Sequence, residues 1–157
     1  MPKPTPFLWF ADQAEEAANF YVSIFPNSRI VTTTRYPENS PGPAGQVMTL
    51  AFELDGQPFT ALNGGHSFTF NEAVSFVVGC ADQAELDHYW DRLLDGGMAS
   101  QCGWLKDRYG LSWQIVPENM AELVGGPDRA KASAATQAML RMVKLDVAAL
   151  QAARDAA

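Results

Sequence analysis

The pentapeptide Ala11-Asp12-Gln13-Ala14-Glu15 recurs as Ala81-Asp82-Gln83-Ala84-Glu85, 70 positions later in a chain of 157 residues. In each copy the Asp can cap a helix, and the Glu three residues later can complete a capping box in which Asp replaces Ser or Thr. A match of five residues can arise by chance, so the flanking sequences must decide. A spacing of nearly half the chain nevertheless points to an internal duplication.

The flanks of the two copies agree. Residues 6–10 and 73–80 are short apolar segments with the composition of strands. After each copy, apolar residues follow at helical spacing. The first stripe consists of Ala14, Ala17, Ala18, Tyr21, Ile24 and Phe25, and the second of Leu86, Tyr89, Trp90, Leu93 and Leu94. We expect the first helix to end at Pro26 and the second at Gly96-Gly97.

Three strand candidates follow each helix. In the first half they are Arg29 to Tyr36, Gln46 to Leu54 and Phe59 to Asn63, with a four-residue turn, 55–58, before the last. Met48, Leu50, Phe52 and Leu54 alternate along the middle one and should share a face. In the second half they are a weak strand near Met98, Cys102 to Lys106, and Leu111 to Val116 after the turn 107–110.

The predicted order is therefore βαβββ followed by βαβββ, an α+β fold. We interpret residues 1–157 as a single domain with module one at 5–63, a linker at 64–72, module two at 73–117 and a C-terminal extension at 118–157. A short helix is expected at 119–124. A longer, Ala-rich helix is expected at 132–153, and its apolar stripe predicts that it docks on other parts of the protein.

Composition excludes several functional classes. The net charge is −7, from 18 acidic and 11 basic residues, and no Lys or Arg cluster suggests nucleic-acid or anionic-membrane binding. No apolar run approaches the roughly 18 to 20 residues of a membrane span, and the N-terminus does not resemble a signal peptide. Cys80 and Cys102 fit neither a disulfide framework nor a zinc motif, so we expect two half-buried apolar thiols in a cytoplasmic protein.

Several motifs together resemble the PhnB-like group of the vicinal-oxygen-chelate (VOC) superfamily, often labelled "3-demethylubiquinone-9 3-methyltransferase domain". The superfamily includes glyoxalase I, bleomycin-resistance proteins and extradiol dioxygenases. The motifs are Phe7 to Phe10, Asp12 to Ala18, Phe20-Tyr21, Phe25 to Ser28, Phe52 to Gly56, Phe59 to Gly65, Phe70 to Phe76, Cys102 to Asp107 and Gly110 to Pro117.

The resemblance implies that the two modules form a cupped sheet of eight strands. Metal-dependent members place ligands in that cup, at positions that correspond here to Thr5, Ala61 or Asn63, Ala73 and Gln114. Such a site needs about three donors such as His, Glu or Asp. We therefore expect no metal and no other cofactor. The methyltransferase label also lacks support from the residues, since no strand followed by a Gly-rich turn and a helix is present.

Strand parity suggests an inner wall of Phe59, Asn63, Trp104, Trp113 and Gln114. A mostly aromatic pocket with a few amides suits a planar or amphiphilic molecule. Packing in the core is the alternative for the aromatic residues, and internal hydrogen bonding is the alternative for the amides.

Weaker candidates for chemistry lie elsewhere. Cys102 could be a reactive thiol, although no neighbouring base is evident, and His66 could act as a general base at the mouth of the pocket. Glu53 and Glu72 could pair as acid and base, although exposed carboxylates are common at strand edges.

Three functional classes remain open. The leading hypothesis is a metal-free protein, homodimeric, that binds and sequesters a small molecule. The second is an enzyme: a metal-dependent lyase or dioxygenase with an unrecognised ligand set, or a methyltransferase. The third is an oligomeric interaction module whose pocket is filled by its own side chains.

Overall fold

The computed structural model describes residues 1–157, which divide into two compact units, 1–69 and 70–157. The boundary lies inside the segment 64–72 that the sequence predicts to be a linker. Each unit is considered separately below. None of the helices combines the length and the apolar composition that crossing a membrane requires.

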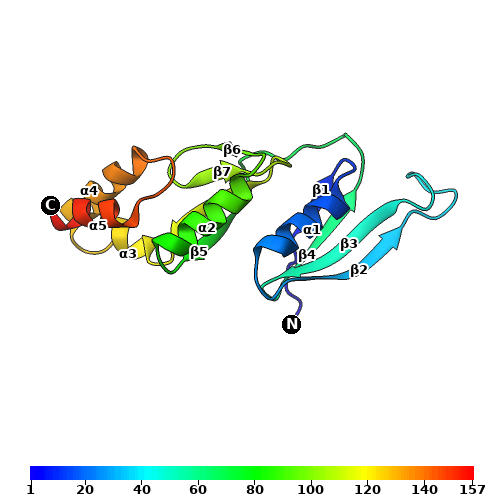
Figure 1. The fold of residues 1–157 in the computed structure, drawn as a ribbon, viewed down its shortest axis with the longest axis horizontal. Helices are drawn as coiled ribbons and strands as arrows, with labels where there is room; N and C mark the ends of the chain where they lie inside the picture. Colours follow the sequence, from blue (N-terminus) through cyan, green and yellow to red (C-terminus); the bar gives the residue numbers. More distant parts are fainter. The chain divides into compact units, whose positions relative to one another are not determined.

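The first unit is a βαβββ module (Figure 1). Its elements are β1 (Phe7–Phe10), α1 (Ala14–Ile24), β2 (Arg29–Arg35), β3 (Val47–Leu54) and β4 (Gln57–Asn63). The sheet order is β1-β4-β3-β2, with β1 parallel to β4 and the other pairs antiparallel.

The second unit repeats this topology, which confirms the predicted duplication. Its module comprises β5 (Ser75–Cys80), α2 (Gln83–Leu94), β6 (Met98–Ala99), β7 (Trp104–Lys106) and β8 (Ser112–Pro117). The sheet order is β5-β8-β7-β6, again with a single parallel pair, β5 with β8. Three helices follow, α3 (Met120–Val124), α4 (Arg129–Leu140) and α5 (Val147–Asp155), and they lie together in the same unit (Figure 1).

The core of the first unit lies between α1 and one face of its sheet. Leu50, Phe52 and Leu54 of β3 are buried and alternate with half-buried residues, as predicted. The ring of Tyr21 on α1 stacks over Phe52, with centroids 6.4 Å apart, and Phe52 stacks on Phe59 of β4 at 5.4 Å. The face of the sheet that carries Phe52 and Phe59 is therefore packed against the helix.

The turn between β3 and β4 is tighter than predicted. Asp55 and Gly56 have φ of 47° and 78°, as in a two-residue hairpin turn of the primed type, for which Asp-Gly is a preferred sequence. Strand β4 therefore begins at Gln57 and not at Phe59. Pro58 is tolerated because β1 pairs with β4 only from Thr60 onward, so no neighbour on that side needs the missing N–H.

The two copies of the repeated pentapeptide start their helices differently. Asp82 caps α2 as predicted, and its side chain accepts a hydrogen bond from the backbone N–H of Glu85 at 2.9 Å. Asp12 does not cap α1, so the prediction for the first copy is wrong. The N-cap there is Gln13, without a side-chain cap, and Asn63 of β4 accepts the N–H of Ala14 instead.

The predicted single helix over 132–153 is also wrong. The chain leaves the helical conformation after Leu140, and α5 starts afresh at Val147 with Asp146 as its N-cap. In between, the carbonyls of Met142 and Val143 accept hydrogen bonds from the N–H groups of Cys102 and Gly103. The extension does dock, as expected, since Leu145 and Leu150 are completely buried.

Candidate functional site

The five residues predicted to line a pocket fall into three groups. Phe59 and Trp113 are buried among the helix-packed residues of their own units, at 6% and 3% exposure. Trp113 lies beside Phe76 at 5.6 Å, and its indole N–H donates to Asp107 at 2.9 Å. Their surroundings favour a role in packing, and ligand contact by either side chain stays a prediction.

Asn63 is committed to internal hydrogen bonds. Its side-chain oxygen accepts from Ala14, and its amide nitrogen donates to the carbonyl of Val47 at 3.1 Å. The Tyr36 hydroxyl donates to the Asn63 backbone carbonyl. This satisfies the amide without a ligand, the alternative that the sequence left open for it.

Trp104 and Gln114 lie on the face of the second sheet that points away from α2. They are paired across β7 and β8, and Val77 of β5 is the neighbour of Gln114 on the other side. Both side chains are half-buried, and Val77 is 62% exposed. The Gln114 amide donates to the Ser75 hydroxyl at 2.9 Å. This face therefore presents an indole ring and an oriented amide side by side.

A cavity of about 120 Å³ opens on the same unit beside Trp104. Its walls come from β6, β7, β8 and the segment before β5. The lining residues are Glu72, Met98, Ala99, Ser100, Trp104, Leu105, Lys106 and Ser112.

Ser112 is the unusual member of this lining. It is 1% exposed, and its hydroxyl oxygen is buried without any hydrogen-bond partner. Because buried polar groups are almost always paired with protein or with ordered water, a hydroxyl without a partner in its own chain is free to bond a water molecule or a ligand that enters the cavity. Sequence reasoning missed Ser112, since a serine at the start of an apolar strand gives no signal of its own.

Glu72 and Lys106 form an ion pair at the edge of the same cavity. The hydrogen bond from Lys106 holds the pKa of the Glu72 carboxyl below its usual value, helped by a backbone hydrogen bond and by the charge of Lys106. Glu53, suggested from the sequence as an acid–base partner of Glu72, belongs to the other unit, so that pairing stays a prediction. Glu53 forms an ion pair with Arg29 at 3.1 Å.

The side chains at the positions where metal-dependent relatives carry ligands are poor ligands for a divalent ion. Asn63 is engaged with Ala14 and Val47, and Gln114 with Ser75. Thr5 and Ala73 are exposed, and neither side chain is a strong donor for a divalent ion. No three His, Cys, Asp or Glu side chains cluster closely enough to hold a metal ion. The residues present therefore do not fit the superfamily's metal.

The other candidates lie apart from this cavity. His66 is exposed and borders a cavity of about 260 Å³ in the first unit, together with Asp12, Tyr36 and Asn63, one of the residues predicted to line a pocket. Cys102 is half-buried in the loop before β7, with its backbone bound to the C-terminal extension. Cys80 is fully buried, and burial, aided by the nearby carboxylates of Glu85, Asp82 and Glu118, raises its pKa to about 11.

Comparison with known proteins extends over both modules. A family model described as 3-demethylubiquinone-9 3-methyltransferase matches residues 2–116. A solved structure of a PhnB protein from Bacillus cereus is 40% identical, covers 73% of this chain and 99% of its own, and superposes with a TM-score of 0.67. No curated protein matches the chain.

More distant structures share the fold. A protein from Pseudomonas aeruginosa is 18% identical, covers 74% of this chain and 97% of its own, and has a TM-score of 0.61. The fosfomycin resistance protein FosX from Mesorhizobium loti is 12% identical, with 74% and 90% coverage and a TM-score of 0.53. The family model and the Bacillus cereus structure, together with the duplicated βαβββ topology, show that the chain belongs to the 3-demethylubiquinone-9 3-methyltransferase domain family, the PhnB-like group of the VOC superfamily.

Proposed function

We propose that the protein binds a planar small molecule, without metal and without turnover, at the cavity of the second unit that Ser112 lines. The observation that carries the proposal is the buried, unpaired hydroxyl of Ser112. A ligand hydroxyl or carbonyl that reached it would supply the missing hydrogen bond, and the nearby Trp104 ring offers a surface for stacking.

The size of the cavity limits what can enter it. An apolar cavity of about 150 Å³ accommodates a benzene molecule. The 120 Å³ cavity is smaller than that, so it suits the hydroxyl-bearing edge of a ring or the polar end of a larger molecule. The rest of such a molecule would extend over the sheet face that carries Gln114 and Val77. This combination favours a substituted aromatic compound with one hydroxyl or carbonyl group.

Charge is not expected to select the ligand. The ammonium of Lys106 is already paired with Glu72, so the edge of the cavity carries no free charge from these two groups. A neutral phenol should therefore bind at least as well as a benzoate. The role we infer is sequestration of such a compound.

The binding test uses 4-fluorophenol as the probe, observed by 19F NMR, with fluorobenzene as the analogue that lacks the hydroxyl. We expect 4-fluorophenol to bind with a Kd on the order of millimolar, as befits so small a ligand. The Ser112→Ala substitution should weaken it about 3- to 10-fold, the value of one hydrogen bond, and leave fluorobenzene unaffected.

Ser67→Ala is the matched control, since Ser67 is exposed in the first unit. Binding of 4-fluorophenol that is equally strong in the wild type and in Ser112→Ala would overturn the proposed site. So would the absence of binding to the wild type.

We further infer a homodimer in the cytoplasm. Large apolar side chains are exposed, among them Phe7 and Met98 at 59% and 70%, and self-association would remove such groups from water. Both cysteines are free, as is usual in a reducing compartment. Sedimentation equilibrium tests the dimer, and a single species of 17.1 kDa would contradict it.

A further inference from the structure

The C-terminal extension lies outside the part of the chain that the family model matches, which ends at residue 116. It nevertheless belongs to the same compact unit as the second module. Its central segment, 141–146, is not helical and lies between two parts of that module. One contact is made by Gln83 of α2, and the other by the loop that leads into β7.

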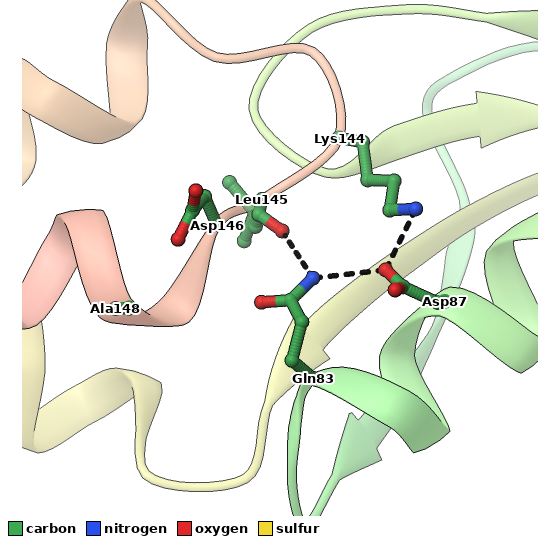
Figure 2. Close-up of a pocket in the computed structure, with 6 residues that line it drawn as sticks. All are labelled: Gln83, Asp87, Lys144, Leu145, Asp146 and Ala148. Carbon is green, nitrogen blue, oxygen red and sulfur yellow. Dashed lines mark hydrogen bonds and ion pairs between the residues drawn. The ribbon is translucent and has the colours of Figure 1, made fainter.

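The Gln83 side-chain amide binds the extension through both its nitrogen and its oxygen, and these contacts are called the Gln83 clasp below. Its nitrogen donates to the Leu145 carbonyl at 3.0 Å and to Asp87 at 2.9 Å, and its oxygen accepts the N–H of Val147 at 2.8 Å. Lys144 adds an ion pair with Asp87 at 2.6 Å. Figure 2 shows the Lys144 and Gln83 side chains converging on Asp87, with Leu145 next to the amide.

The other side of the segment holds a strained loop. Cys102 and Gly103 both have positive φ, 58° and 84°, a conformation that costs a non-glycine residue free energy. Their N–H groups donate to Met142 at 2.9 Å and to Val143 at 2.8 Å. A β-carbon at Gly103 would lie 3.1 Å from the Leu145 side chain, so Leu145 packs directly against this loop.

The strained loop continues into the wall of the Ser112 cavity. Trp104 follows Gly103 immediately, and its N–H and carbonyl bond to Gln101 and Ser100. Ser100 and Trp104 both line the cavity. A continuous path of contacts therefore runs from Gln83 through Leu145 and Gly103 to Trp104.

We propose that the Gln83 clasp and the extension segment 141–146 position the Trp104 wall of the cavity, so that binding depends on residues that do not touch the ligand. Gln83 is a positioning residue in this scheme. The expected effect on ligand binding rests on the proposed function. The structural coupling between Gln83 and Trp104 can be measured without any ligand.

The repeated pentapeptide supplies a matched pair of variants. Gln83→Leu removes the clasp with little change in volume. Gln13→Leu alters the equivalent residue of the first copy, which is exposed and makes no side-chain cap. Asn63→Ala, in the first unit, serves as a destabilised control that leaves the extension untouched.

The first readout needs no ligand. In protein labelled with 5-fluorotryptophan, with the Trp104 signal assigned by Trp104→Phe, Gln83→Leu should shift or broaden that signal. It should also raise hydrogen exchange at the Cys102 and Gly103 amides by about tenfold, through local opening. Gln13→Leu and Asn63→Ala should do neither.

The second readout is the Kd of 4-fluorophenol, which Gln83→Leu should weaken by about fivefold or more, the lower end of coupling between sites. Unchanged Trp104 signal and unchanged exchange in Gln83→Leu would overturn the coupling. A changed Trp104 signal with an unchanged Kd would overturn its role in binding. If wild type does not bind the probe, the proposed function fails, while the first readout still decides the coupling.

Discussion

The side-chain oxygen of Asn63 lies 2.7 Å from the backbone nitrogen of Ala14 and accepts its hydrogen bond, so the last residue of β4 caps α1. A second bond joins the Asn63 amide to the Val47 carbonyl at 3.1 Å. One side chain therefore ties together the start of the helix, the start of β3 and the end of β4.

Substitution of Asn63 should destabilise the protein. Asn63→Ala leaves the Ala14 N–H and the Val47 carbonyl unpaired, and we expect a loss of about 1–3 kcal/mol in the free energy of unfolding. Asn63→Asp keeps an acceptor for Ala14 but sets a carboxylate oxygen against the Val47 carbonyl, where two acceptors cannot pair, so it should not restore full stability. Urea denaturation measures both. The control Asn19→Ala removes one exposed bond to Glu15 and should stay within about 0.5 kcal/mol.

The sequence predicts the fold well because the decisive signals are local. The repeated pentapeptide, the helical stripes and the Asp55-Gly56 turn each act within a few residues, and together they predict two βαβββ modules. The capping of α1 could not be predicted, since Asn63 lies 49 residues from Ala14 in the sequence. The break in the C-terminal helix has the same cause, because Cys102 and Gly103 bind its backbone from about 40 residues away.

The candidate site was predicted less well. Strand parity groups residues on a face, but it does not say which face a helix covers. Gln114 and Trp104 lie on the face of the sheet that α2 does not cover. Trp113 lies on the other face, and its indole N–H donates to Asp107. Ser112 stands out because its buried hydroxyl has no hydrogen-bond partner within the chain, and this can be seen only in the folded structure.

Asp107 should be a strong determinant of stability in the second unit. It is 3% exposed, and it accepts hydrogen bonds from the N–H groups of Tyr109 and Leu111 and from the indole of Trp113. In Asp107→Asn, the amide nitrogen would face either the indole or a backbone N–H, and two donors cannot pair. We expect a loss of about 1–3 kcal/mol in urea denaturation.

Trp113→Phe separates the indole bond from the turn. It removes one donor and leaves the two backbone bonds to Asp107, so it should destabilise less than Asp107→Asn does. Equal losses for the two variants would contradict the importance of the backbone bonds.

The two thiols should differ sharply in reactivity. Burial raises the pKa of Cys80 to about 11, so at pH 8 only about one Cys80 side chain in a thousand is a thiolate, and the residue is fully buried. Cys102 is half-buried. A colorimetric thiol reagent should therefore titrate at most one group in the native protein and two after denaturation. Cys102→Ser should abolish the native signal, and a remaining signal would show that Cys80 is accessible.

Protonation of Glu72 at low pH should break its ion pair with Lys106 at the edge of the cavity. The pKa of Glu72 is lowered in the folded state, chiefly by its hydrogen bond with Lys106. A carboxyl whose folded pKa lies below its unfolded value stabilises the fold above the unfolded pKa, and this contribution is lost as the pH falls through the folded pKa. Because Glu72 is exposed, the effect on global stability should be small, so the sensitive measurement is local.

In a 13C NMR titration, the Glu72 carboxyl should titrate below the usual glutamate value of 4.5, and Lys106→Met should move its midpoint upward. Lys131→Met is the control, since Lys131 lies on α4, and it should leave the Glu72 midpoint unchanged. A Glu72 midpoint that does not respond to Lys106→Met would show that the pair does not hold in solution.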